Sequence, residues 1–298
     1  HEDGTGVLWV GTDNGLHRFD RATSRFVKYE NDPANPSSLS NNRIRVIFED
    51  REGSVWLGTE GGGLNRFDRA TETFTRFNHN PSNPTSLKSD YIRSITQDRE
   101  GSLWVGTEGG GLNRMDVVTG RFRHFVHDAQ NDQSLASDLV RVVYIDQEGT
   151  LWVGTGDEGL DRFDAATETF RHFRHDSRDP QSLAHDWVRA IRQDSRGTLW
   201  VGTDGGLCEY RPETGNFNRY VHDPTDPVSL VENRVTTIYE DRGGVLWVGT
   251  YKIAQTRKVE DVAAPTGYRY VAQGIEPVQS TQRVAAVIGT RFGVAYAL

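Results

Sequence analysis

The sequence predicts an all-β fold, a β-propeller built from four-stranded antiparallel blades. First, the pentapeptide Leu-Trp-Val-Gly-Thr, or a close variant, recurs at a nearly constant interval. Second, short runs rich in Val, Ile, Phe, Tyr and Trp alternate with clusters of Gly, Asp, Asn and Pro, a pattern typical of strands joined by turns. The resulting repeat of about 48 residues runs five times and breaks off in a sixth copy.

The tryptophan of the pentapeptide sets the register of the repeat. Its copies are 47 or 48 residues apart: Trp9, Trp56, Trp104, Trp152, Trp200 and Trp247. A large ring on the second strand of each blade can fill the space between neighbouring sheets. We therefore interpret this column as the structural core of the repeat, in preference to a ring of platforms that stack on sugars.

The second copy shows how one repeat divides into strands. We predict strands near residues 44–49, 55–59, 64–68 and 74–78, with the turn residues 50–53 and 68–71 between them. Four antiparallel strands per repeat make a propeller blade. Helical repeats are excluded, because no segment keeps apolar residues at helical spacing for three turns.

The repeat also predicts the domain boundaries. Residues 1–250 are expected to be propeller repeats, with four complete blades at about 43–222 and blade remnants at both ends. We expect this to be an incomplete propeller in a fragment or processed chain. Residues 251–298 lose the repeat, with strand-like runs at 268–272, 283–288 and 293–297, and begin another β module or mark an abnormal junction.

Composition narrows the function. With 34 basic and 42 acidic residues the net charge is −8, which argues against nucleic acid as a partner. The single cysteine, Cys208, allows neither an internal disulfide nor a thiolate metal site. No apolar run approaches the length of a membrane helix, so we expect no membrane contact within this chain.

We predict no catalytic residues, no metal and no cofactor. No Ser-His-Asp order and no HExxH motif stands out. Histidines recur at His79, His127, His175 and His222, but equivalent residues on successive blades lie too far apart to share one ion. We interpret them as caps of the long loops, and His124 and His172, on the fourth strand, as structural.

The alternation of strand direction identifies the face on which function is expected. The loops after the second and fourth strands must emerge on the same face, which therefore carries every long loop, such as residues 79–87. Loops on a rigid scaffold usually carry binding. A ligand or partner site is expected there.

One column on that face varies from blade to blade, just before the first strand: Arg43, Tyr91, Leu139, Trp187 and Arg234. Aromatic and arginine side chains stack on or pair with sugars, carboxylates and protein surfaces. We take this column as the candidate ligand-binding site; the alternative is an ordinary rim that nothing constrains. Two residues further on, Arg45, Arg93, Arg141 and Arg189 recur, which favours a ladder of ion pairs between blades over a binding ring.

Residues 98–114, together with the long loop that ends in Ser-Leu, resemble the two-component regulator propeller repeat, over about residues 5–250. The resemblance implies a periplasmic, ligand-sensing propeller of a bacterial hybrid histidine kinase or a related receptor. It implies a non-catalytic module that binds a small molecule or oligosaccharide, with self-association or a downstream signalling domain as further partners. The alternatives are a protein-interaction scaffold and, less favoured, a propeller lyase or hydrolase.

Overall fold

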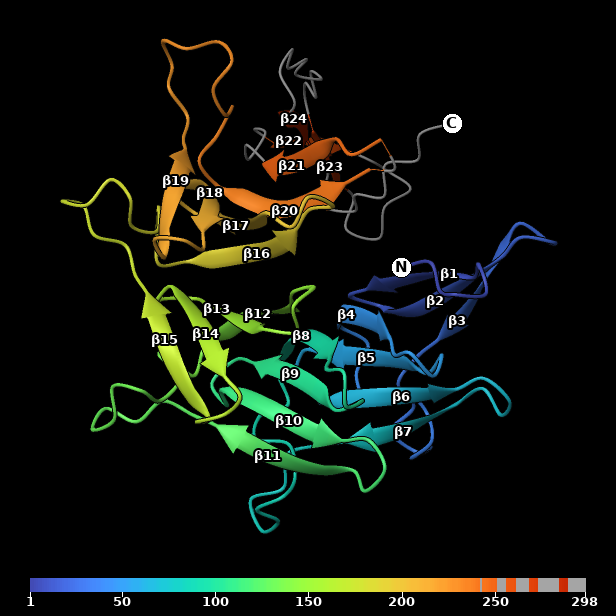
Figure 1. Ribbon diagram of the computed structural model, residues 1–298. Coiled ribbons are helices and arrows are strands. Elements are labelled where there is room, and N and C mark those ends of the chain that lie inside the picture. Colours follow the sequence, from blue (N-terminus) through green and yellow to red (C-terminus); the bar gives the residue numbers. More distant parts are fainter. Residues whose placement is uncertain (242, 251–255, 261–267, 273–283, 289–298) are drawn as a thin grey trace. The chain divides into compact units, whose positions relative to one another are not determined.

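The computed structural model describes residues 1–241, 243–250, 256–260, 268–272 and 284–288. All the regular elements in these residues are strands, labelled β1 to β24 in Figure 1. They form two compact units: His1–Arg174 with Asp186–Val188, and His175–His185 with Arg189–Leu298. We call them the first and the second unit and describe each by itself.

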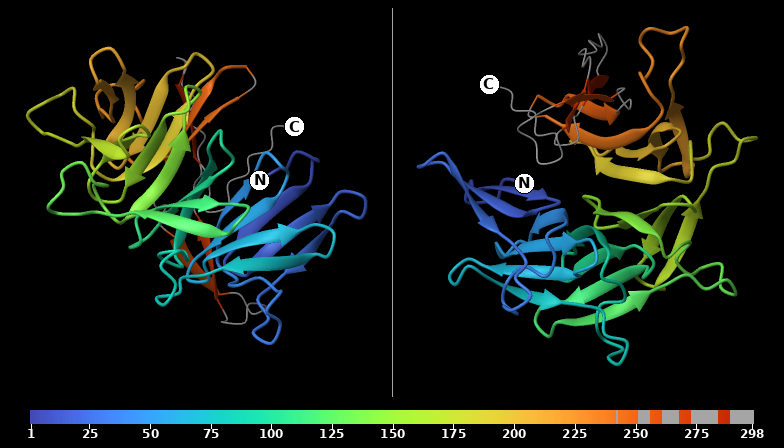
Figure 2. Two further views of the ribbon diagram at one scale, coloured as in Figure 1. Left: turned by 60° about the horizontal axis from the view of Figure 1, so that its bottom comes forward. Right: turned by 180° about the vertical axis from the view of Figure 1, so that it is seen from behind.

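The first unit opens with a three-stranded sheet followed by three four-stranded blades, each in sequential strand order. The opening sheet consists of β1 (Leu8–Thr12), β2 (Gly15–Asp20) and β3 (Arg25–Tyr29). The blades are β4 (Ile44–Glu49), β5 (Val55–Thr59), β6 (Leu64–Asp68) and β7 (Thr73–Phe77); β8 (Ile92–Gln97), β9 (Leu103–Thr107), β10 (Leu112–Asp116) and β11 (Arg121–Phe125); and β12 (Val140–Ile145), β13 (Leu151–Thr155), β14 (Leu160–Asp164) and β15 (Thr169–Phe173). In both views of Figure 2 these sheets follow one another side by side in chain order, and the first strands of successive blades are in contact.

The second unit contains the fourth four-stranded blade: β16 (Val188–Gln193, with its first residue in the first unit), β17 (Leu199–Thr203), β18 (Gly206–Arg211) and β19 (Asn216–Tyr220). Next come β20 (Val235–Glu240), β21 (Leu246–Thr250), β22 (Thr256–Glu260), β23 (Tyr268–Ala272) and β24 (Val284–Ile288). β21 pairs antiparallel with β20 but parallel with β24, so the blade pattern ends where the repeat ends.

The fold class that the sequence predicts is confirmed. Three strands of the second repeat have the predicted bounds, and the fourth begins one residue earlier than predicted, at Thr73. The strand-like run at 293–297 lies outside the described residues.

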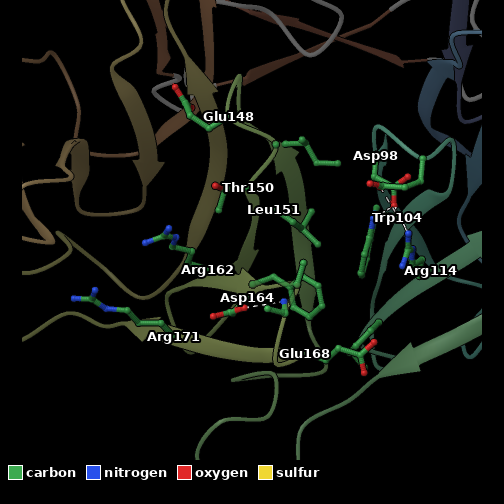
Figure 3. Close-up of a pocket in the computed structure, with 17 residues that line it drawn as sticks. Asp98, Trp104, Arg114, Glu148, Thr150, Leu151, Arg162, Asp164, Glu168 and Arg171 are labelled. Atoms are coloured by element: carbon green, nitrogen blue, oxygen red, sulfur yellow. Dashed lines mark hydrogen bonds and ion pairs between the residues drawn. The ribbon is translucent and has the colours of Figure 1, made fainter.

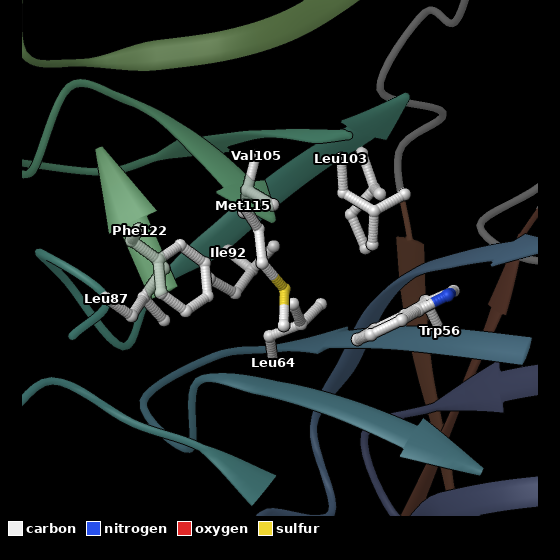
Figure 4. Packing of buried hydrophobic residues seen from close by; sticks show 9 residues of the cluster. Trp56, Leu64, Leu87, Ile92, Leu103, Val105, Met115 and Phe122 are labelled. Atoms are coloured by element: carbon white, nitrogen blue, oxygen red, sulfur yellow. The ribbon is translucent and has the colours of Figure 1, made fainter. Parts of the chain in front are cut away.

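The hydrophobic core of the first unit lies between successive sheets. In Figure 4, Trp56 and Leu64 of one blade pack with Ile92, Leu103 and Met115 of the next. Trp9 and Trp104 lie in equivalent clusters between their own sheet and the following one. In the tryptophan column, Trp9, Trp56, Trp104 and Trp152 are buried, whereas Trp200 and Trp247 in the second unit are half-buried.

A hydrogen bond fixes each of these tryptophans to its own blade. The ring nitrogen Nε1 donates to an aspartate six residues earlier over 2.7 to 2.9 Å, in the pairs Trp9–Asp3, Trp56–Asp50, Trp104–Asp98, Trp152–Asp146, Trp200–Asp194 and Trp247–Asp241. The same aspartates also accept from backbone N–H groups of the turn before the second strand, such as Ser54 N on Asp50 at 2.7 Å. One side chain therefore closes the turn and satisfies the only polar atom of a buried ring.

Candidate functional site

The predicted binding column lies where each blade begins. In three successive blades the backbone oxygen of the column residue, in Arg43, Tyr91 and Leu139, accepts a hydrogen bond of 2.9 Å from the residue that follows the second strand. That residue is Glu60, Glu108 or Gly156. The first strand and the loop after the second strand are thus held together in the same way in every one of these blades.

The column residues have different surroundings. Tyr91 is 48% exposed, Leu139 is half-buried, and the ring of half-buried Trp187 lies 5.3 Å from Cζ of Arg141. Two members bind acidic loop residues: Arg43 lies 3.3 Å from Glu60, and, in the second unit, Arg234 lies 3.4 Å from Asp204. The structure therefore places four of the five column residues in the first unit. Both arginines of the column are already paired with carboxylates.

The second arginine column forms ion pairs both within and between blades. Arg45 pairs with Glu60 of its own blade and with Asp13 of the preceding sheet, and Arg93 pairs with Glu108 of its own blade. In the second unit, Arg189 pairs with Asp204 over 2.9 Å. The sequence analysis expected ion pairs between blades. The structure adds ion pairs within a blade, because the loop after the second strand of the same blade supplies an acidic partner for each of these arginines.

These pairs control the ionisation of the loop acids. Burial acts to raise the pKa of Glu60, but the hydrogen bond and charge of Arg45 outweigh it and lower the pKa below its ordinary value. The pKa of Asp204 is lowered in the same way by Arg189 against the effect of burial. Both carboxylates are therefore ionised and occupied near neutral pH.

A cavity of about 570 Å³ lies between the blades β8–β11 and β12–β15. Figure 3 shows Asp98, Trp104 and Arg114 on one side and Arg162 and Arg171 on the other. The turn residues Glu100, Glu148 and Glu168 also line it, so it opens on the face of the tight turns, opposite the long loops.

Two arginines that line this cavity lie against the tryptophan of their own blade. Arg114 lies 2.9 Å from Asp98 and 5.3 Å from the Trp104 ring, while Arg162 lies over the ring of Trp152. The sequence analysis identified the tryptophans as core residues but did not identify the arginines that lie over them. A sequence signal was available: each of the three blades of the first unit has an arginine two residues before the Asp that ends its third strand. In the structure, the guanidinium of this arginine lies over the tryptophan ring of its own blade.

A second cavity, of about 740 Å³, lies beneath the long loop between β7 and β8 and is lined by residues such as Arg76, His79 and Phe122. The recurring histidines shape these loops. The Nδ1 atoms of His79, His127, His175 and His222 lie 2.6 to 3.0 Å from the carbonyl oxygens of Leu87, Leu135, Leu183 and Leu230. Each histidine therefore closes its own loop.

The described residues offer little other chemistry. Among them, no group of three or more His, Cys, Asp or Glu side chains is placed to hold a metal ion. Burial raises the pKa of the Cys208 thiol to about 11, so the thiolate is scarce at neutral pH. Within the described part of the chain, no helix has the length and apolar character needed to cross a membrane.

Solved structures share the fold. The extracellular domain of a protein assigned as a hybrid two-component system of Bacteroides thetaiotaomicron is 24% identical, with a TM-score of 0.71 over 95% of this chain. The chain spans 36% of that domain. Virginiamycin B lyase of Staphylococcus aureus is 15% identical, with a TM-score of 0.62 over 93% of this chain and 84% of the lyase.

Sequence comparison identifies the repeat itself. A histidine kinase P4 of Formosa agariphila is 37% identical over 57 residues, which is 19% of this chain and 4% of the kinase. The two-component regulator propeller family matches residues 38–61, 86–109, 134–157, 182–205 and 229–252, in register with the repeat described above. The chain therefore belongs to the two-component regulator propeller family.

Proposed function

We propose that this chain is a non-catalytic ligand-sensing module of a bacterial two-component signalling receptor, located in the periplasm. The observation that carries the proposal is the fivefold match to the two-component regulator propeller family. The similarity to an extracellular domain of a two-component protein supports a place outside the cytoplasm. The shared fold of virginiamycin B lyase shows why architecture alone does not assign the function: one fold carries both enzymes and sensors.

The ligand that we propose is an oligosaccharide bound on the face of the long loops. Tyr91 and Trp187 both belong to the first unit and directly precede the strands β8 and β16, beside loops fixed by backbone hydrogen bonds. Flat aromatic rings next to arginines suit a sugar, because the apolar faces of the sugar ring pack on aromatic rings while its hydroxyl groups accept from guanidinium groups. Binding there would transmit a conformational signal to a downstream domain or to a second copy of the receptor.

Titration of the purified chain with a panel of neutral and acidic oligosaccharides, followed by calorimetry, tests this proposal. We expect one class to bind, and Tyr91→Ala or Trp187→Ala to weaken binding at least about 5-fold, the equivalent of about 1 kcal/mol. Phe26→Ala, which removes an aromatic ring that is 54% exposed on β3, is the matched control and should bind as the wild type does. A folded protein that binds no member of the panel would contradict the ligand class and favour the alternative of a protein-interaction scaffold.

A further inference from the structure

One position in the row of ion pairs lacks its carboxylate. The residue after the second strand is acidic in four sheets, as Asp13, Glu60, Glu108 and Asp204, but it is Gly156 in the blade β12–β15. Arg45, Arg93 and Arg189 each pair with the acid of their own blade. Arg141, the equivalent arginine, has no such acid to pair with.

The backbone does not require glycine at this position. Gly156 is absent from the glycines with positive φ, and its N–H donates to Leu139 O over 2.9 Å, just as Glu60 and Glu108 donate to their column residues. A Cβ atom on Gly156 would lie 3.0 Å from Nε of Arg141 and 3.7 Å from Cβ of Leu139. The Arg141 side chain therefore lies against Gly156, where the side chain of an acidic residue would begin in the other blades.

Arg141 retains unused hydrogen-bonding capacity. Its Nε is buried and has no hydrogen-bond partner among the described residues. Its Nη1 lies 3.4 Å from Oε2 of Glu108, but that oxygen also accepts from Arg93. One carboxylate thus serves two guanidinium groups, and a buried donor is left unsatisfied, which is costly unless something else accepts from it.

We propose that the Arg141 guanidinium, beside Gly156, binds the carboxylate of a uronic-acid sugar, which takes the place of the acidic side chain that the other blades supply. Trp187 and Leu139 flank this position and give an apolar boundary to the ligand, with the Trp187 ring 5.3 Å from Cζ of Arg141. A planar guanidinium suits a carboxylate because it can donate two parallel hydrogen bonds. This inference rests on the proposed function and specifies its ligand as an acidic oligosaccharide.

The proposal is tested with trigalacturonate and with the same oligosaccharide after reduction of its carboxyl groups. The wild type should bind trigalacturonate about 10-fold to 100-fold more tightly than the reduced form. Gly156→Glu, which supplies a carboxylate like that of Glu108, and Arg141→Met should both lose this preference. Gly156→Gln, which adds similar volume without the charge, separates the loss of the anion site from simple obstruction: it should weaken both sugars, whereas Gly156→Glu should weaken trigalacturonate more.

Arg45→Met is the matched control, because Arg45 stands in the same column but already pairs with Glu60 and Asp13. It should keep the preference for the carboxylated sugar. Equal affinity of the wild type for both sugars, or an unchanged preference in Gly156→Glu, would overturn the inference and leave a neutral-sugar sensor standing.

A second readout separates the carboxylate site from oligosaccharide sensing. Addition of sodium acetate should shift the Nε–H NMR signal of Arg141 in the wild type and not in Gly156→Glu. A shift with acetate combined with no binding of any oligosaccharide would overturn both the sugar ligand and the proposed function. No shift with acetate would overturn the carboxylate site alone.

Discussion

Single residues give this repetitive fold its local differences, and the pair Asp161–His172 shows this on the two outer strands of one blade. Its counterparts at the same register are Asn65–Arg76, Asn113–His124 and Cys208–Arg219, so a carboxylate faces a histidine in only one of these four blades. Nδ1 of His172 lies 2.6 Å from Oδ1 of the fully buried Asp161, and Nε2 lies 2.8 Å from the carbonyl oxygen of Asp132. Both ring nitrogens face acceptors, which favours the imidazolium form.

The pair makes stability depend on pH. The hydrogen bond that His172 donates to Asp161 raises the pKa of His172 against the effect of burial, while burial raises the pKa of Asp161 against the effect of His172. A histidine whose pKa is higher in the folded state than in the unfolded state, where it is about 6.5, contributes to the free energy of unfolding. This contribution is complete below pH about 6.5 and is lost as the pH rises through the folded-state pKa. The raised pKa of Asp161 acts with the same sign, at lower pH.

We therefore expect the free energy of unfolding, measured by denaturant titration from pH 6 to pH 9, to fall more steeply with pH in the wild type than in His172→Gln. His124→Gln is the matched control, because His124 faces Asn113 and lacks the carboxylate. It should keep the slope of the wild type. A His172→Gln curve parallel to that of the wild type over this range would show that the imidazolium is not favoured by the fold.

At the scale of the strand, the glycine of the pentapeptide determines how closely successive blades approach. A Cβ atom on Gly58 would lie 2.4 Å from Ile92 of the next blade, and one on Gly106 would lie 2.6 Å from Val140. Neither glycine has a positive φ, so space rather than backbone conformation excludes a side chain. In these blades, side chains of the first strand of the next blade therefore pack directly against the backbone of the second strand.

Gly106→Ala should therefore destabilise the protein by about 1 to 3 kcal/mol through overpacking, measured by chemical denaturation. Combining it with Val140→Ala, which removes the opposing methyl groups, should cost less than the sum of the two single substitutions, because the added methyl occupies the space that Val140 leaves. Gly4→Ala is the control, since its Cβ would meet Glu49 at an ordinary 3.5 Å. Additive costs for the pair would mean that the two residues are not in direct steric contact.

The strands were predictable from sequence and the cavities were not, for a physical reason. The strands β4 to β6 follow from local alternation of apolar and polar residues and from the turn residues between them. In the turn at residues 50–53, the side chain and the backbone oxygen of Asp50 both accept hydrogen bonds from nearby backbone N–H groups. The cavity beside Trp104 depends on the separation of two blades, which no local pattern encodes. Gly156 stands out in the sequence as a break in an acidic column, but the unsatisfied Nε of Arg141 is visible only once the side chains are placed.

At the scale of the whole molecule, the two units differ in what forms their cores. In the first unit, three clusters between successive sheets include Trp9, Trp56 and Trp104. In the second unit, a cluster around Leu207 and Val235 includes the half-buried Trp200. Because each repeat is stabilised mainly by its nearest neighbours, local opening is expected to stay within the unit whose core is weakened.

Two equivalent substitutions test this by hydrogen exchange. Val105 on β9 and Val201 on β17 occupy the same position of the pentapeptide, and both are fully buried, one in each unit. Truncation to alanine removes the same atoms from both and should cost about 2 kcal/mol in each case. We expect Val105→Ala to accelerate amide exchange in β4 to β14 and to leave β17 to β20 protected, and Val201→Ala to do the reverse. Uniform acceleration along the chain in both variants would show that the described repeats open as one cooperative body, in which a ligand bound at any blade stabilises all of them equally.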